Sequence, residues 1–205
     1  VSEGVEFPES FHQIIEYGIL SSQANPFDPM EKAISQIGDH YFQHTEHLHA
    51  DWVMEKEYPL SQEMLAMSRV FKSTGTKGKV IAAKGAPEAI FDLCHLDSVK
   101  KVAYETAVKE MASAGLRVLG VTKAGISSDS LPENQHDFNF EFVGLIGLAD
   151  PIRVNIPEAI AECYQAGIRV IMITGDYPVT AISIAKEIGL KNPELCIAGN
   201  ELLEM

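Results

Sequence analysis

The amino-acid sequence predicts an α+β domain, built from an antiparallel sheet with helices, followed by part of an α/β domain with a parallel sheet. Two observations lead to this fold class. In the first half of the chain, short apolar segments are separated by turn signals that are typical of hairpins. From Glu141 onward, strand and helix patterns alternate with short connections, which is typical of βαβ units. We therefore expect two domains, residues 1–149 and residues 150–205.

The first domain is expected to begin with two helices and a hairpin. Apolar residues recur at helical spacing from Phe11 to Leu20, and "NPFDPMEKAISQIG" places Pro29 in a first turn and Gly38 at a helix end. The segments "WVMEKEYPL" and "AMSRVFKS" are typical of strands. "KSTGTKGK" contains two glycines and predicts a hairpin turn, after which "KVIAAKG" returns along the sheet.

The next elements complete this domain and lead into the second. Pro87 begins a short helix through Cys94, Ser98 caps a longer helix that Gly115 ends, and "LRVLGVTKA" is a further strand. After a polar loop, we expect strands in "EFVGLIGLAD", "IRVIMITG" and "LCIAG", with helices in "PEAIAECYQAG" and "PVTAISIAKEIG". The apolar run "IRVIMITG" predicts a parallel strand that is buried on both faces.

Composition and charge exclude several classes of protein. Acidic residues outnumber basic ones 29 to 16, and the resulting net charge of -13 argues against nucleic acid or an anionic membrane surface as a partner. No apolar run approaches the roughly 20 residues that span a bilayer, and no signal peptide is recognisable, so we expect a soluble chain. The three cysteines are far apart and are expected to be free thiols.

Polar residues follow the predicted buried strand directly, at Thr174, Gly175 and Asp176. Open α/β sheets bind ligands at the carboxyl ends of their parallel strands. A threonine hydroxyl and a glycine N–H there suit a phosphoryl group, because the following helix N-terminus favours an anion. The Asp176 carboxylate suits Mg²⁺ or a ribose. The alternative is that these residues only form a turn.

Three charged residues are further candidates. Lys84 ends a predicted strand in "AAKGAPEAIF", where its ammonium group suits a phosphate, and Arg117 begins another strand of the same sheet and would join it. Glu31 lies in the first turn of a predicted helix. The alternative for the lysine is an ordinary solvated side chain, and for the glutamate an exposed acid that the helix dipole favours.

Two other patterns are weaker indications of function. His40, His44, His47 and His49 cluster in "GDHYFQHTEHLHADW", and positions 40, 44 and 47 would share a helix face. Zinc or nickel is conceivable there, but no cysteine is close, and we favour a surface helix and loop without a metal. "GLIGLA" superficially fits a dinucleotide loop, yet its glycines lie inside an apolar run and favour close packing in a strand.

Three separated motifs, "KGAPEAI", "FVGLIGLADPIR" and "AGIRVIMITGDYPVTAISIAKEIGL", resemble those of P-type cation-transporting ATPases in order and spacing. "FDPMEKA" is similar to the acidic segment of that family, and "LRVLGVTKA" to its arginine strand. The resemblance covers nearly the whole chain and is thinnest from Gly38 to Tyr58. It implies a nucleotide-binding domain followed by part of a phosphorylation domain with a haloacid-dehalogenase-like parallel sheet.

The resemblance also implies a nucleotide site that takes ATP with Mg²⁺. Lys84 and Gly85 would line the adenine pocket, Glu31 would contact the adenine or ribose, and Arg117 would approach the phosphates. At the places where the family often has a phenylalanine and a lysine, this sequence has Leu60 and Leu65. The resemblance therefore implies a pocket with reduced affinity for the nucleotide.

The same family resemblance assigns roles beyond the first domain. Asp150 and Arg153 would lie at the hinge near the nucleotide, and Thr174, Gly175 and Asp176 would face the phosphoryl group. The family's phosphorylated aspartate, in Asp-Lys-Thr-Gly-Thr, is absent, and so is its Mg²⁺-binding Gly-Asp-Gly-x-Asn-Asp segment. We therefore expect a fragment that contains no catalytic residue of its own and is inactive alone.

The implied whole protein is a multi-pass membrane pump whose cytoplasmic portion includes this chain. Lys-Gly-Ala-Pro-Glu favours the calcium, sodium or magnesium branches, and calcium is our expectation for the transported cation. An unpaired edge of the partial sheet predicts self-association or a mobile C-terminal third. The alternative function is a non-catalytic nucleotide- or metal-binding module of haloacid-dehalogenase-like ancestry.

Overall fold

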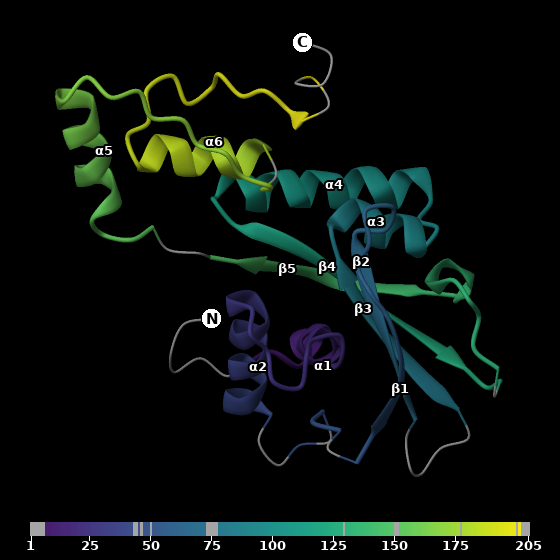
Figure 1. Ribbon diagram of the computed structural model, residues 1–205. Helices are drawn as coiled ribbons and strands as arrows, with labels where there is room; N and C mark the ends of the chain where they lie inside the picture. The colour runs from purple at the N-terminus through teal and green to yellow at the C-terminus, as the bar shows by residue number, and fades with distance from the viewer. Residues whose placement is uncertain are drawn as a thin grey trace. The chain divides into compact units, whose positions relative to one another are not determined.

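The computed structural model describes residues 7–42, 45, 47–49, 51–72, 78–128, 130–149, 152–176, 178–199 and 201. The chain forms two compact units (Figure 1). The first unit comprises Val1–Lys101 and Leu119–Ile146, and the second comprises Val102–Val118 and Gly147–Met205. The predicted functional boundary at residue 150 stays a prediction.

A five-stranded sheet carries the first unit (Figure 1). Its order is β1-β2-β3-β4-β5, and the pairs from β1 to β4 are antiparallel, as the hairpin pattern predicted. The turn between β2 and β3 falls on residues 73–77, outside the described residues. The strands are β1 Val53–Tyr58, β2 Ala66–Lys72, β3 Lys79–Gly85, β4 Arg117–Ile126 and β5 Glu141–Leu148.

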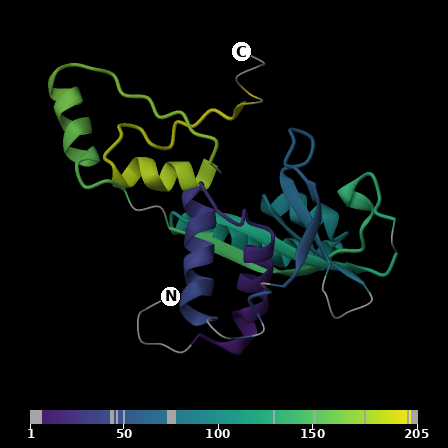
Figure 2. The ribbon, with the colours of Figure 1, turned by 60° about the horizontal axis from the view of Figure 1, so that its bottom comes forward.

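Helices cover both faces of this sheet, with α1 (His12–Leu20) and α2 (Pro29–Tyr41) side by side on one of them (Figure 2). A short helix of three residues, η1 Glu9–Phe11, precedes α1. On the opposite face α3 (Pro87–Leu93) packs so closely that a Cβ on Gly120 would lie 2.9 Å from Ile90. These helices confirm the ones predicted from apolar spacing and from proline at a first turn.

The core lies between β1–β4, α3 and the segment that precedes β5. This segment contains a short helix, η2 Gln135–Asp137. The Gln135 side chain accepts a hydrogen bond from the Ser68 hydroxyl (2.5 Å) and donates one to the Ala66 carbonyl (3.0 Å), so a buried amide is satisfied. The buried core residues are Tyr58, Ala66, Val70, Ile81, Ala83, Ile90, Leu93, Ala124, Phe138 and Phe140.

The helix α4 (Ser98–Ser113) differs from the prediction in two details. Its cap is Asp97 rather than Ser98, because Asp97 Oδ1 accepts the N–H groups of Val99 (3.1 Å) and Lys100 (2.9 Å). Val99 and Val102, two apolar residues at helical spacing in this helix, are exposed rather than buried. The end at Gly115 is confirmed, and this glycine has the positive φ (77°) typical of a residue that follows a helix.

The parallel sheet expected in the second unit is not formed by the described residues. The predicted helices are present as α5 (Ile156–Gln165) and α6 (Pro178–Glu187), but residues 168–174 and 195–199 form no strand. The predicted strand is not buried either: Ile168, Ile171 and Ile173 are 55%, 66% and 94% exposed. A parallel strand that is buried on both faces needs neighbouring strands and a layer of helices over each face of the sheet. Among the described residues, the segment 168–174 has no neighbouring strand.

The strand predicted in "EFVGLIGLAD" is present but has a different role. As β5 it lies beside β4 at the edge of the antiparallel sheet, instead of opening a parallel one. Its glycines allow close packing, as predicted, since a Cβ on Gly144 would lie 2.7 Å from the end of the Ile14 side chain. In the described part of the chain, no helix is both long and apolar enough to cross a membrane.

Candidate nucleotide site

The site is built around Lys84, which lies near the end of β3 and is only 6% exposed. Its ammonium nitrogen lies 2.5 Å from Glu31 Oε1 and donates a second hydrogen bond to the Ser22 hydroxyl oxygen (2.5 Å). The structure therefore brings together two residues that the sequence predicted separately, 53 positions apart. A charge-assisted bond of this length in a dry environment is among the stronger contacts available to a side chain.

Glu31 is held in place by the start of α2. Asp28 caps this helix by accepting hydrogen bonds from the N–H groups of Met30 (2.8 Å) and Glu31 (3.3 Å). Pro29 follows at the first helical position, where its missing N–H costs nothing. The second carboxylate oxygen of Glu31 accepts the Gln23 N–H (3.2 Å), so the loop between the two helices is tied to the same group.

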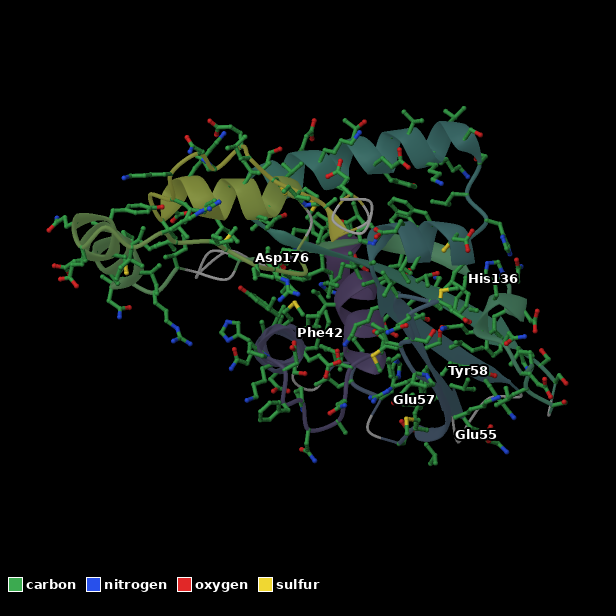
Figure 3. The ribbon with its side chains drawn as sticks, turned by 45° about the horizontal axis from the view of Figure 1, so that its top comes forward. Phe42, Glu55, Glu57, Tyr58, His136 and Asp176 are labelled. Carbon is green, nitrogen blue, oxygen red and sulfur yellow. The ribbon has the colours of Figure 1, made fainter. Side chains whose placement is uncertain are left out.

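A second buried cation, Arg69 of β2, belongs to the same network, and the sequence reasoning missed it. Its Nε and Nη2 donate to Glu57 Oε2 of β1 at 2.8 and 2.6 Å (Glu57 is labelled in Figure 3), and its Nη1 donates to the Ser22 carbonyl. We call Ser22, Glu31, Glu57, Arg69 and Lys84 the lysine cluster. An arginine inside the otherwise apolar run "AMSRVF" was the signal in the sequence, because a charge there needs a partner.

The surroundings lower the pKa of Lys84 below the usual lysine value of 10.5. Burial is the main cause, since it disfavours the charged form. The hydrogen bond and charge of Glu31 act in the opposite direction, and the positive charge of Arg69 lowers the pKa further. Perturbed lysines of this kind cluster at functional sites, although structural ion pairs also produce them.

The other residues expected in the nucleotide pocket fall into two groups. Gly85 pairs with Ala66, and a Cβ at Gly85 would lie 2.3 Å from the Leu65 carbonyl oxygen, so strand packing alone requires glycine here. Leu60 and Leu65 are 60% and 44% exposed, and Leu65 lies two positions from Met67, which pairs with Lys84. Leu65 immediately precedes β2, and its carbonyl oxygen accepts the Ala86 N–H (2.8 Å).

Within the second unit, Arg117 lies beside Asp176. Arg117 Nε lies 2.9 Å from Asp176 Oδ1 (Asp176 is labelled in Figure 3). The Thr174 hydroxyl donates to Asp176 Oδ2 (2.7 Å) and accepts the Asp176 N–H (3.0 Å). Arg117 starts β4 and belongs to the second unit, whereas Lys84 belongs to the first, so the expectation that Arg117 joins Lys84 stays a prediction.

Two of the predicted residues show little site geometry, and a third cannot be placed. Gly175 is exposed, has an ordinary φ, and a Cβ there would meet nothing within 4 Å. Arg153 is exposed in the turn before α5, where its carbonyl accepts the Ile156 N–H (3.0 Å). Asp150 lies outside the described residues.

The described histidines of this segment lie in a helix and in the loop that follows it. The helix α2 ends at Tyr41, so His47 and His49 lie beyond it, and His44 is outside the described residues. Glu16 accepts hydrogen bonds from His47 Nδ1 (2.8 Å) and His49 Nε2 (2.7 Å), which ties this loop to α1. Among the described residues, no group of three or more His, Cys, Asp or Glu side chains is arranged to hold a metal ion.

The antiparallel sheet with its helices and the lysine cluster define a class of protein. The chain belongs to the P-type ATPase family, since residues 27–155 match the family model "P-type ATPase, cytoplasmic domain N". The matched range contains all of the lysine cluster except Ser22, and it stops short of Thr174 and Asp176.

Similar curated proteins are sodium/potassium-transporting ATPases. Subunit alpha of Drosophila melanogaster is 39% identical over 144 residues, or 61% of this chain and 13% of that protein. Subunit alpha-1 of Oreochromis mossambicus is 35% identical over 169 residues, or 72% of this chain and 16% of that protein. Subunit alpha-2 of Rattus norvegicus is 37% identical over 144 residues, or 61% and 14%. The chain thus spans less than a fifth of these relatives, and their names give the expected calcium branch no support.

Proposed function

We propose that the first unit binds an adenine nucleotide, ATP, on the face of the sheet that carries Lys84. The observation that carries the proposal is the buried Lys84–Glu31 pair, which lies within the range that matches domain N. An ammonium donor beside a carboxylate acceptor suits a base that offers both ring nitrogens and an exocyclic amine. Gly85 would form the floor of the pocket, and Leu65 would offer an apolar surface beside it.

Binding is expected to be weak. Stacking of a base on an aromatic side chain contributes about 1–3 kcal/mol, and Leu60 and Leu65 can supply no such stack. A charge-assisted hydrogen bond from a lysine at position 65 would add about 1.5–3 kcal/mol. Without both contributions, the dissociation constant for ATP rises by about two powers of ten or more, from micromolar towards millimolar.

For the whole protein we propose ATP-driven cation transport across a membrane through an aspartyl-phosphate. The nucleophile is proposed to lie outside this sequence, because no aspartate here is followed by lysine. Residues 150–205 would contribute to a haloacid-dehalogenase-like phosphorylation domain. Within it, Thr174, Gly175 and Asp176 would contact the phosphoryl group of ATP bound with Mg²⁺, and Asp150 and Arg153 would lie near the nucleotide. This chain would be part of the cytoplasmic portion and would not hydrolyse ATP alone.

The identity of the transported cation is the most specific part of this proposal. The relatives are named for sodium and potassium, whereas we expected calcium among the calcium, sodium and magnesium branches that the "KGAPE" motif favours. ATP hydrolysis by the full-length pump in lipid vesicles, measured with Ca²⁺ alone and with Na⁺ and K⁺ together, decides between these cations. Stimulation by Ca²⁺ alone would support the calcium branch, and joint stimulation by Na⁺ and K⁺ would replace it.

The test of nucleotide binding is an ATP titration followed by NMR. Amide shifts are expected near Glu31 and Lys84, and Lys84→Ala should abolish them. Lys101→Ala is the matched control, since Lys101 is an exposed lysine of the same unit. Leu60→Phe with Leu65→Lys should tighten binding. If Lys84→Ala binds ATP as well as the parent chain, the site is wrongly assigned.

A further inference from the structure

Ser22 connects the two buried cations of the lysine cluster. Its hydroxyl oxygen accepts a hydrogen bond from Lys84 Nζ, and its carbonyl oxygen accepts one from Arg69 Nη1. The hydroxyl donates its own proton to the Gly18 carbonyl of α1 (2.7 Å), and its backbone N–H binds the Ile19 carbonyl (2.8 Å). Ser22 is therefore held both by the end of α1 and by Arg69, and its hydroxyl oxygen receives Lys84.

The sheet places these cations next to each other. Arg69 pairs with Ala82, and Lys84 is two positions further along β3, so the two side chains share a face as diagonal neighbours. Each cation has its own carboxylate, since Glu57 pairs with Arg69 and Glu31 pairs with Lys84. Glu57 and Ser22 both accept hydrogen bonds from the Arg69 guanidinium. Arg69 would therefore influence a ligand through these neighbours and not through direct contact.

Lys84 retains capacity for a ligand. An ammonium group has three N–H donors, and Glu31 and Ser22 occupy two of them. Within the described residues, the third N–H of Lys84 has no partner. Its direction depends on where the other two acceptors sit, and Ser22 is one of these acceptors.

We propose that Arg69 is a positioning residue of the nucleotide site. By binding the Ser22 carbonyl, Arg69 fixes the acceptor that orients Lys84. The positive charge of Arg69 also repels the buried Lys84 ammonium, which therefore favours an additional partner that offers hydrogen-bond acceptors. This inference rests on the proposed binding of ATP at Lys84. Arg69 itself would not touch the nucleotide. The arrangement also explains why a fixed arginine is buried beside a lysine, since the repulsion between them favours a ligand that supplies acceptor atoms.

The test compares Arg69→Met, which removes the charge but keeps an unbranched side chain, with Arg69→Lys. Arg69→Met is expected to bind ATP about tenfold more weakly, since a hydrogen bond to a charged group is lost from the support of Lys84. Removing the positive neighbour also raises the pKa of Lys84, so the loss of binding at alkaline pH should move to higher pH. Arg69→Lys should restore the pH profile without restoring full affinity, because lysine cannot make the forked contact.

The titration of the Lys84 amine is a readout that would not change if Arg69 had a purely structural role. NMR of a chain with labelled lysine amines follows the titration of Lys84 with and without Arg69. Should Arg69→Met fail to fold, Glu57→Gln on the edge strand loosens Arg69 while its charge stays, and a fall of several-fold in ATP affinity is expected.

The outcomes separate this inference from the proposed function. If Lys84→Ala abolishes ATP binding while Arg69→Met changes neither the affinity nor the Lys84 titration, the positioning role is wrong and the site stands. If Lys84→Ala still binds ATP, the proposed site fails. The amine titration then still decides whether Arg69 acts on Lys84.

Discussion

At the scale of single residues, Lys84 sets the chemistry of the first unit. A lysine is almost never this deeply buried without a partner, and here its partner and its desolvation act in opposite directions on its proton affinity. The folded state holds the Lys84 proton less tightly than the unfolded chain does. This difference is measurable without any ligand.

Lys84 should make the stability of the first unit depend on alkaline pH. Below the lowered pKa both states are charged. Between that pKa and 10.5 the unfolded chain binds the extra proton, so the free energy of unfolding rises with pH. The slope can reach at most about 1.4 kcal/mol per pH unit. Chemical denaturation over this pH range should show the rise in the parent chain and not in Lys84→Met. Parallel curves for the two chains would contradict it.

At the scale of elements, the first turn of α2 holds the acidic half of the site. Asp28→Ala removes the cap and should lower the free energy of unfolding by about 1 kcal/mol. ATP affinity should fall with it, because Glu31 lies within the turn that loosens. Asp28→Asn keeps a side-chain acceptor and is the control. Equal stability of the alanine and asparagine variants in urea denaturation would show that the cap contributes nothing.

Gly85, in the paired strands β2 and β3, and Gly175, on exposed backbone, should respond differently to one added methyl group. Gly85→Ala places a Cβ against the Leu65 carbonyl and the Ala66 Cα, both rigid backbone atoms, and should cost at least about 1–3 kcal/mol. Gly175→Ala meets no atom within 4 Å and should stay within about 0.5 kcal/mol of the parent. Thermal unfolding of the two variants checks this. A tolerated alanine at position 85 would mean that the strands are less closely paired there.

Elements were predictable from the sequence where their cause is local. Asp28 followed by Pro29 marks the start of α2, and the glycines of "KSTGTKGK" mark the hairpin, because capping and turn chemistry act over a few residues. The run at residues 168–174 was wrongly predicted to be a buried strand, since a strand exists only with a partner. Arg69 was missed for a similar reason, because Glu57 and Ser22 are 12 and 47 positions away.

At the scale of the whole molecule, the unpaired segment at residues 168–174 predicts self-association. Ile171 and Ile173 are exposed on backbone that forms no strand, and such segments favour pairing with another chain. Sedimentation velocity should show concentration-dependent association that Ile171→Lys with Ile173→Lys suppresses. Val99→Lys, at an exposed apolar residue of α4, is the control and should have no effect. A strictly monomeric parent chain with slow amide exchange across this segment would count against it.

The loop before β1 gives the chain a built-in optical label. Trp52 is the sole tryptophan in the sequence, it lies in the first unit, and its indole stacks on His49 with ring centroids 3.7 Å apart. Indole emission during denaturation therefore reports the first unit, whereas far-ultraviolet circular dichroism sees the helices of both. If the two signals change at different urea concentrations, the units melt separately. The gap between the two curves then measures how far the stability of the first unit is independent of the unit that carries Asp176.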